Sequence, residues 1–380
     1  MDWRQWREEF PSATRQVHMN HAGIAPLPRR VAAAIRLFAD QALLLDRTVY
    51  QGWEARAEEV RAAAARLIGA HAHEIAFVRS TSEGLSLVAS GLAWQAGDNV
   101  VAVADEYPSN VYPWFGLRRF GVETRLLARP QRRFGAADVA ALIDRRTRVL
   151  AVSAVDWQSG FRVDLAQLSE LCRARGVLVV VDGIQAVGAL RIDVAACGID
   201  VLAAGGHKWL LAPEGCGIVF VSDRIIERID PVVLGWKSVD NAGVYLPYHF
   251  DLRGDAARLE PGSAPHLGIH ALGAAIDLLF EVGPAAIETR VLENTDQLAD
   301  GLRRLGATIL SPRAAAERSA ILTFALGDTP ALHRALTDAG IIVRERLGGI
   351  RLAPHFYNDA GDAARVLDVV RAVRAQSGSG

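Results

Sequence analysis

The chain has 380 residues, 51% of them hydrophobic and 22% charged, so it is long enough for two domains and has the composition of a globular protein. A formal net charge of −1 gives no reason to expect nucleic acid or an anionic membrane as a partner. No apolar run is long enough to span a bilayer, and the first ten residues (MDWRQWREEF) carry charges of both signs, unlike a signal peptide, so we expect a cytoplasmic protein.

Between about residues 74 and 222, short β-branched runs alternate with helical patterns. The runs are EIAFV, NVVAV, RVLAVSAV, VLVVVDG, DVLAAGG and GIVFVS, and the helical stretches include EGLSLVASGL and DLAQLSELCRARG. Nearly continuous apolar strands that alternate with helices are typical of a sheet with both faces covered. This region therefore predicts an α/β fold with a mostly parallel sheet between helices.

From about residue 284 the pattern changes to a long helix (AAIETRVLENTDQLADGLRRLG), two short strands (TIL and AILTFAL) and two more helices. This order indicates a smaller α+β domain, with GPAA as the hinge. We expect a large domain over residues 17–283 and a small C-terminal domain over 284–380. Residues 1–16 are expected to pack against the small domain.

Polar residues follow three of the predicted strands, at the sheet edge where ligands of open parallel sheets gather. Thr81 and Ser82, in RSTSEG, open a helix, where the helix dipole favours an anion; simple N-capping is the alternative. Asp182 ends the most hydrophobic strand, where a carboxylate is costly unless it is paired. Lys208 follows the strand DVLAA within GGHKW.

Lys208 stands out because the chain is rich in arginine and has only one other lysine, Lys237. Arginine serves a salt bridge or a phosphate contact at least as well as lysine, but it cannot attack a carbonyl as a neutral amine. Lys208 is therefore either an ordinary surface lysine or a Schiff-base residue. An anion cradle, a buried aspartate and a lone lysine at neighbouring strand ends match what pyridoxal 5'-phosphate (PLP) requires.

The order of these residues resembles the fold-type I PLP enzymes, specifically the class V aminotransferase and cysteine desulfurase group. The resemblance covers nearly the whole chain and is most specific in VDGIQAVGAL and HKWLLAPEGCG. It implies PLP as cofactor, with Lys208 as Schiff-base residue and proton shuttle, Asp182 as partner of the pyridinium nitrogen, and Gln185 as donor to the ring hydroxyl.

The same resemblance implies a phosphate site and a dimer. Thr81, Ser82 and His207 match the phosphate ligands. Ser263, in LEPGSAPH, matches a segment that reaches the partner's cofactor across a homodimer. One position departs from the desulfurases, because Gly205 stands where they have a serine, so one phosphate donor is lost.

On the substrate side, the resemblance makes Arg351, in GIRLAPHFYN, the clamp for the carboxylate of an amino acid, with Arg344 in VRERL as the competing candidate. Tyr107, in EYPSNVYPW, takes the place of a ring-stacking histidine. Trp157 and Gln158, in DWQSGF, replace a substrate-side asparagine. They are candidates for shaping a different pocket, although core packing is an alternative for Trp157.

The cysteines bear most on the reaction. Sulfur transfer by the desulfurases needs a nucleophilic cysteine on a loop near the active site, and the matching loop here, RERLGGIRL, contains none. Cys172, Cys197 and Cys216 fall on two helical segments and a strand start. We therefore expect an aminotransferase or a C–S (β-elimination) lyase and not a persulfide-forming desulfurase. The alternatives are an epimerase of the isopenicillin N epimerase type and a non-catalytic PLP-binding protein.

No metal is expected. The histidine pairs at 18 and 21, 71 and 73, and 266 and 270 have no acidic or cysteine partners clustered with them in sequence, so structural or surface roles are favoured. A nicotinamide-binding domain would give a similar strand and helix pattern. The chain, however, has no G-x-G-x-x-G at a strand-to-helix turn.

Overall fold

The computed structural model describes residues 2–377, and its largest element is a seven-stranded sheet. The strands lie in the order β2-β8-β7-β6-β5-β3-β4. Strand β8 runs in the opposite direction to the other six strands of this sheet, so the expected mostly parallel sheet is confirmed. The strands are β2 (Ile75–Val78), β3 (Asn99–Val103), β4 (Glu123–Leu127), β5 (Thr147–Ser153), β6 (Leu178–Asp182), β7 (Val201–Gly205) and β8 (Gly217–Val221).

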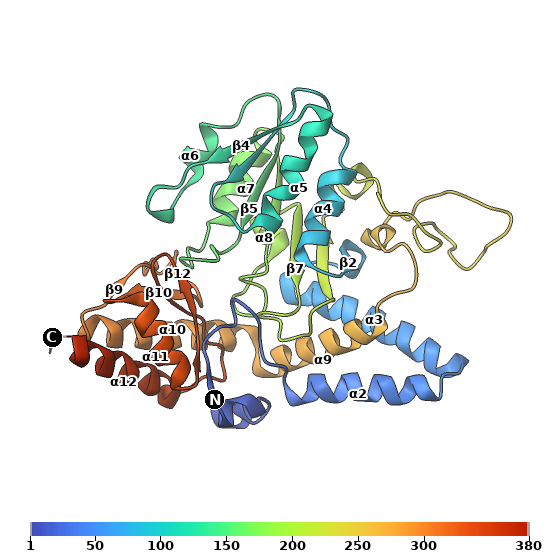
Figure 1. Cartoon of the computed structure of the whole chain (residues 1–380). Helices are drawn as coiled ribbons and strands as arrows, with labels where there is room; N and C mark the ends of the chain where they lie inside the picture. The colour runs from blue at the N-terminus through green and yellow to red at the C-terminus, as the bar shows by residue number, and fades with distance from the viewer. Residues whose placement is uncertain (1, 378–380) are drawn as a thin grey trace.

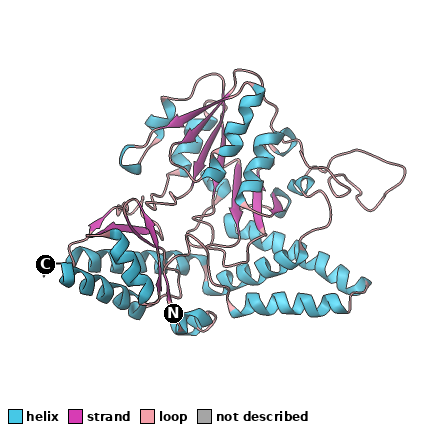
Figure 2. Cartoon of the chain, in the orientation of Figure 1, coloured by secondary structure: helices cyan, strands magenta, loops and turns pink. Residues whose placement is uncertain are grey.

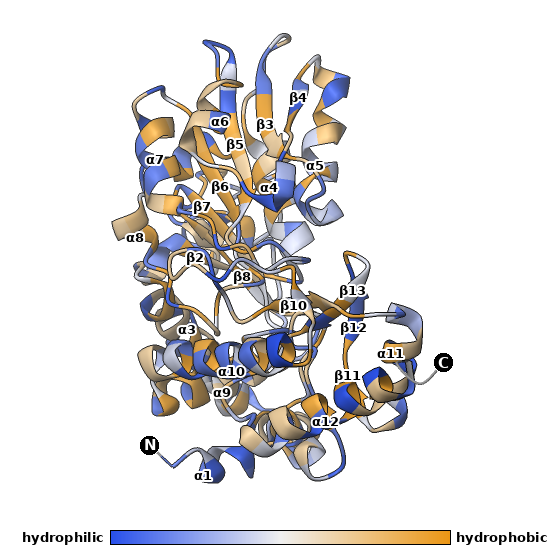
Figure 3. Ribbon diagram, turned by 90° about the vertical axis from the view of Figure 1, so that its left-hand side faces the viewer, coloured by the Kyte–Doolittle hydropathy of each residue, from blue (hydrophilic) through white to orange (hydrophobic). Residues whose placement is uncertain are grey.

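Both faces of this sheet are covered, which explains why its strands read as continuous apolar runs. Successive residues of a strand point to opposite faces. In β3, Val101 and Val103 belong to one buried apolar cluster, whereas Val100 and Ala102 belong to another. Figure 3 shows the same concentration of hydrophobic residues along the strands of the sheet.

Helices of different lengths make up the two covering layers (Figures 1 and 2). The long helices α2 (Arg29–Leu43) and α3 (Arg47–Ile68) both pack against α9 (His266–Val282). Helices α6 (Ala136–Ala140), α7 (Leu165–Arg173) and α8 (Val194–Cys197) contribute to the same apolar cluster as α3 and α9, and α4 (Thr81–Gly91) and α5 (Tyr112–Phe115) contribute to the other.

A second, smaller sheet lies in the C-terminal part of the chain, at the lower left of Figure 1. Its strands are antiparallel, in the order β12-β13-β10-β9, and its own apolar cluster includes Leu298, Phe324 and Val366. The elements here are α10 (Pro284–Arg304), β9 (Thr308–Ile309), β10 (Leu322–Ala325), α11 (Thr329–Asp338), β11 (Ile341–Ile342), β12 (Arg344–Arg346), β13 (Gly349–Leu352) and α12 (Ala360–Ser377).

The chain turns sharply where this smaller part begins. Gly283 has a φ of 91°, which suits glycine, and Pro284 takes the first position of α10. The axes of α9 and α10 differ by 80° across this break.

Among residues 2–377, no single helix is long and apolar enough to cross a membrane. Helices α9 and α10 meet the length and composition criteria only when they are taken together, across the bend. The division of the chain into domains at residues 283 and 284 stays a prediction.

The N-terminal residues contact the C-terminal part of the chain. Strand β1 (Val17–His18) pairs in parallel with β11. Ahead of it, in and just after helix α1 (Trp3–Arg7), the guanidinium of Arg7 lies 2.7 Å from the carboxylate of Asp362, and the ring of Phe10 stacks on Tyr357 with centroids 3.7 Å apart. The segment 17–25 that follows lies near Asp182 and Lys208, because its Ala22 carbonyl accepts from Gln185 and its Ala25 amide donates to the carbonyl of His207.

Candidate active site

A cavity of about 540 Å³ lies at the carboxyl ends of the central strands, against β12 and β13. Nine of the residues proposed in the sequence for catalysis or binding line it, as does Arg344, the competing candidate for the carboxylate clamp. Four further lining residues were not anticipated: Asn20, Ser109, Glu214 and Arg346. Gln158 and Ser263 do not line it. The nine are Thr81, Ser82, Tyr107, Trp157, Asp182, Gln185, His207, Lys208 and Arg351.

Lys208 presents a buried amine to this cavity. It lies just after β7, its side chain is buried, and its Nζ makes no hydrogen bond or ion pair with another described residue. Burial lowers the pKa of Lys208 to about 8; nearby Asp182 opposes this shift, whereas Arg351 and Arg346 reinforce it. Lys237, by contrast, is held by the carboxylate of Glu54, 2.9 Å from its Nζ. Lys208 is thus the lysine with a free amine suited to attack a carbonyl.

Asp182 is a buried carboxylate at the end of β6. The Ile184 amide donates a hydrogen bond to its Oδ1 over 2.9 Å, and no cationic side chain among the described residues bonds to it. Burial raises the pKa of Asp182 to about 6, while the Ile184 amide and Lys208 act in the opposite direction. A carboxylate left in this state is suited to a cationic ring N–H from a ligand.

Gln185 is held in place from two sides. Its amide donates to the carbonyl of Ala22 (3.0 Å), and its Oε1 accepts from the indole N–H of Trp209 (2.9 Å). Trp209 is fully buried directly after Lys208. The two contacts fix the orientation of the amide and leave its second N–H available to the cavity.

The N-terminus of α4 forms one end of the cavity. Ser80 caps the helix by accepting from the Glu83 amide, and Thr81 Oγ1 accepts from the Gly205 amide (2.9 Å), which ties α4 to β7. The hydroxyls of Ser82 and Ser109 are 2.7 Å apart. Ser109 was missed in the sequence, although it follows Tyr107 by two residues. Free helix N–H groups, hydroxyls and His207 together suit a phosphate.

Two aromatic rings form a wall beside Lys208. Tyr107 meets Trp157 edge-to-face with centroids 5.4 Å apart, and Nζ of Lys208 lies 5.4 Å from the Tyr107 centroid. The indole of Trp157 donates to the carbonyl of Asp105 (3.2 Å), so Trp157 lines the cavity rather than the apolar core. Gln158 uses its carbonyl to accept from Thr323 (2.6 Å).

Arg351 is the most buried of the cavity's arginines, with 2% of its surface exposed. It donates to the carbonyl of Trp157 (2.6 Å) and to Oδ1 of Asn20 (3.0 Å), while its Nε has no partner among the described residues. Burial, followed by Arg346 and Arg344, lowers the pKa of Arg351 to about 9. Asn20 therefore orients the guanidinium, and the unpaired N–H remains for an anion.

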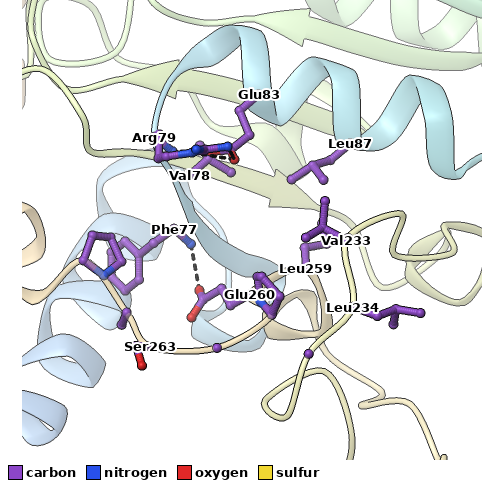
Figure 4. Close-up of a pocket in the computed structure, with 15 residues that line it drawn as sticks. Phe77, Val78, Arg79, Glu83, Leu87, Val233, Leu234, Leu259, Glu260 and Ser263 are labelled. Carbon is purple, nitrogen blue, oxygen red and sulfur yellow. Dashed lines mark hydrogen bonds and ion pairs between the residues drawn. The ribbon is translucent and has the colours of Figure 1, made fainter.

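Ser263 lines a different cavity, of about 560 Å³, between β2 and the segment around residues 233–235 (Figure 4). There Glu260 accepts from the Phe77 amide (2.7 Å), and Arg79 and Glu83 form an ion pair at 2.6 Å. Within its own chain, Ser263 is therefore separate from the cavity that holds Lys208.

No group of three or more histidine, cysteine, aspartate or glutamate side chains that could hold a metal is found in residues 2–377. The rings of His18 and His21 pack edge-to-face, and each bonds to a backbone carbonyl. His71 and His73 stack, and the ring of His73 is 2.8 Å from the carboxylate of Asp223.

The groups around the first cavity fit PLP. An unpartnered amine, a buried carboxylate lacking a cation and a helix N-terminus with hydroxyls open onto one space. These groups correspond to the aldehyde, the ring nitrogen and the phosphate of that cofactor.

Comparison with known proteins agrees with this fit. The aminotransferase class-V family model matches residues 17–367. The isopenicillin N epimerase of Streptomyces clavuligerus is 30% identical and aligns over 99% of both chains. A cysteine desulfurase of Cronobacter sakazakii is 33% identical over 90% of this chain and 87% of its own.

Among solved structures, the cystine C–S lyase C-DES in complex with cysteine persulfide has a TM-score of 0.88 at 22% identity, covering 95% of this chain and 99% of its own. A C-DES mutant with glycine covalently linked to the PLP cofactor has a TM-score of 0.89 at 22% identity, over 96% and 98% of the two chains. These likenesses confirm the expected fold. The chain belongs to the aminotransferase class-V family and is a PLP-dependent enzyme.

Proposed function

We propose that this enzyme acts on an α-amino acid, either as an aminotransferase or as a C–S (β-elimination) lyase, and forms no persulfide on a cysteine of its own. The observation that carries the proposal is a cavity with an amine, a carboxylate and an arginine clamp, and with no cysteine among its lining residues. The names of the relatives leave the reaction open, since they include a desulfurase, a lyase and an epimerase.

The three cysteines are poor nucleophiles where they stand. Cys172 and Cys216 are buried, and burial raises the pKa of each thiol to about 12. Cys197 is half-buried at the end of α8, and burial raises its pKa as well. Because the thiolate is the reactive form, none of them is suited to accept sulfur from a substrate at neutral pH.

The residues proposed in the sequence each have a role in PLP-dependent amino-acid chemistry. Bound PLP supplies an electron sink that stabilises negative charge at the substrate Cα. Nζ of Lys208 would hold the cofactor's aldehyde and would take and return the Cα proton of the substrate; a pKa near 8 suits both directions. The carboxylate of Asp182 would keep the ring nitrogen protonated, and Gln185 would donate to the ring hydroxyl.

The remaining residues bind and orient. Thr81, Ser82 and His207 would hold the phosphate, and Tyr107, whose ring lies beside Lys208, would cover the cofactor ring. Arg351 grips the substrate carboxylate, and Trp157 closes the side of the pocket where substrate lies. Gln158 would act only indirectly, through the Thr323 contact that fixes its backbone. The orientation imposed on the substrate selects which Cα bond breaks.

We further propose a homodimer in which Ser263 reaches the partner's phosphate site. Residues 231–255 extend away from the body of the chain (Figure 1). They carry exposed apolar side chains, among them Leu234, Tyr245, Leu246, Tyr248 and Phe250. An exposed patch of this kind is typical of an interface, and it continues to the cavity that Ser263 lines.

Epimerisation is the second candidate, supported by the alignment of isopenicillin N epimerase over 99% of both chains. One substrate screen separates the three reactions. Purified holoenzyme is incubated with L-amino acids and thioethers, with and without a keto-acid acceptor. Keto acid formed only with the acceptor indicates transamination, release of thiol or sulfide indicates elimination, and an inverted stereocentre indicates epimerisation. Turnover that is abolished by replacing Cys172, Cys197 and Cys216 together with serine in a folded protein would contradict the proposal.

A further inference from the structure

Three arginines of the small sheet face the same cavity. Arg344 and Arg346 occupy alternate positions of β12, so they share one face of the strand, and Arg351 follows on β13. In the register of the two strands Arg344 lies directly opposite Arg351. Like charges placed directly opposite each other across strands are destabilising. The intervening Glu345 lies on the other face, where its carboxylate is 3.7 Å from His333.

None of these arginines forms an ion pair with a carboxylate among the described residues. Arg346 donates to the neighbouring carbonyl of Glu345 (2.7 Å), and its Nε is buried without a hydrogen-bond partner. Among residues 2–377, Arg351 bonds only to the carbonyl of Trp157 and to Asn20, and its Nε also has no partner there. Unpaired buried donors on cations are costly. Arg344 is exposed and Arg346 half-buried, so the cluster has guanidinium groups available to more than one anionic group of a ligand.

Arg346 lies on the substrate side of the cavity. Its guanidinium stacks over Trp157 at 5.0 Å, and Trp157 in turn packs against Tyr107, which borders Lys208. The positive charge of Arg346 adds to the effect of burial in lowering the pKa of Lys208. Arg346 therefore lies at the Trp157 side of the cavity, where Arg351 also bonds to the Trp157 carbonyl.

We infer that Arg346, assisted by Arg344, binds a second anionic group at the end of the substrate's side chain. The substrate class is then an acidic α-amino acid with a side-chain carboxylate, sulfinate or sulfonate. The inference rests on the proposed function, in which Arg351 takes the α-carboxylate. A planar guanidinium matches such oxyanions with two parallel hydrogen bonds, and its stacking on Trp157 orients the guanidinium beforehand.

The test uses pairs of amino acids that differ only in charge. PLP-loaded enzyme is titrated with L-aspartate against L-asparagine and L-glutamate against L-glutamine, and binding is followed by the visible cofactor band and by calorimetry. The acidic member should bind about ten- to hundredfold more tightly, the range for hydrogen bonds to charged groups. L-cysteine sulfinate in the same titration distinguishes a sulfinate preference from a carboxylate preference.

Matched variants assign the effect. Arg346→Gln should reduce the acid-to-amide ratio to near one while the amides still bind, and Arg344→Gln should reduce it in part. Arg365→Gln, on the exposed side of α12 and outside the cavity, should leave the ratio unchanged. If Arg346→Gln does not fold, the wild-type ratio must still fall as salt rises, because the contact is electrostatic.

Equal affinity for acid and amide in the wild type, or a ratio that survives in both folded variants, overturns the inference. These results would leave the proposed function standing, since neutral amino acids still change the cofactor band. If no α-amino acid changes the band, the proposed function itself fails, and the substrate class falls with it.

Discussion

The state of two side chains, Lys208 and Asp182, decides what this cavity can do. Both are buried, and burial disfavours the charged form of each. For an amine this leaves a larger neutral fraction at physiological pH, and the neutral amine is the nucleophile. For the carboxylate it leaves an unsatisfied site that a cationic ring N–H would stabilise.

The rate at which the apoprotein takes up PLP should report the pKa of Lys208. Because that pKa is about 8, uptake should rise about tenfold per pH unit below pH 8 and level off above it. An ordinary lysine would give a rate that still rises towards about pH 10. Stopped-flow absorbance between pH 6 and 10 measures this. Borohydride should then fix the label to the peptide that contains Lys208; a label on Lys237 would refute the assignment.

Asp182→Asn should separate stability from activity. The folded pKa of about 6 lies above the ordinary value of 3.8, so the stabilising contribution of this group is present below about pH 4 and is lost as pH rises through about 6. At pH 7.5 the apoprotein variant should therefore be more stable than wild type, by on the order of 3 kcal/mol. Turnover of the PLP-loaded variant should fall by several orders of magnitude, because the electron sink is lost.

Urea unfolding of both apoproteins at pH 4 and pH 7.5, with turnover of the loaded forms, checks this. A variant that is less stable at pH 7.5 would mean that Asp182 serves the fold. Near-normal turnover would remove it from the mechanism.

At the scale of elements, the site depends on a junction between α4 and β7. Thr81 opens the helix and accepts a hydrogen bond from the Gly205 amide at the end of the strand, whereas the Ser82 hydroxyl bonds, among residues 2–377, to the hydroxyl of Ser109. The bond between Thr81 and the Gly205 amide therefore stabilises the fold and also shapes the cavity. The second is confined to the cavity rim.

This junction predicts different effects for two neighbouring substitutions. Thr81→Val leaves the buried Gly205 amide unpaired, so it should lower the free energy of unfolding by about 1–3 kcal/mol and also weaken PLP binding. Ser82→Ala should weaken PLP binding without a comparable loss of stability. Thermal unfolding of the apoproteins and equilibrium dialysis of PLP test the contrast. It fails if both variants lose the same stability.

The sequence predicts the strands well because burial on both faces leaves continuous apolar runs. Polar residues that directly follow such runs, Asp182 and Lys208 among them, can therefore be assigned to one sheet edge from the order of the residues. The direction of a strand cannot be predicted from its apolar pattern in the same way. The run GIVFVS resembles the other runs, yet β8 is antiparallel to its neighbours.

Other parts of the cavity depend on contacts between distant segments. Asn20 reaches Arg351 only because β1 packs against the C-terminal part of the chain. Arg346 lines the cavity because the register of β12 with β13 places it on the same side as Arg351. In DWQSGF, Trp157 lines the cavity and Gln158 does not, since neighbouring side chains point in different directions and sequence alone does not say which points inward.

At the scale of the whole molecule, the proposed homodimer can be tested by mixing two inactive variants and measuring whether activity returns. Chains with Lys208→Ala and chains with Ser263→Arg are each expected to have little activity alone. Mixed dimers should regain one working site, because intact Ser263 of the first chain serves intact Lys208 of the second. Refolding the two in equal amounts and assaying turnover measures this.

Sedimentation velocity provides the control that mixed dimers form. If Ser263 acted within its own chain, neither site of the mixed dimer would be complete and no activity would return. A monomer that holds PLP and turns over substrate would refute the dimer as well.

The pairing of β1 with β11 also bears on how the protein is made. Residues 17–25 leave the ribosome before any strand of the large sheet. Strand β11, with which β1 pairs, is made only after β8, the last strand of that sheet. The carbonyl of Ala22 holds Gln185, and the Ala25 amide bonds to the carbonyl of His207, so this early segment is also a wall of the cavity. Pairings between segments so distant in the chain form slowly. A nascent chain with its large sheet complete would still have an open cavity, and PLP would be enclosed only after the later strands have been translated.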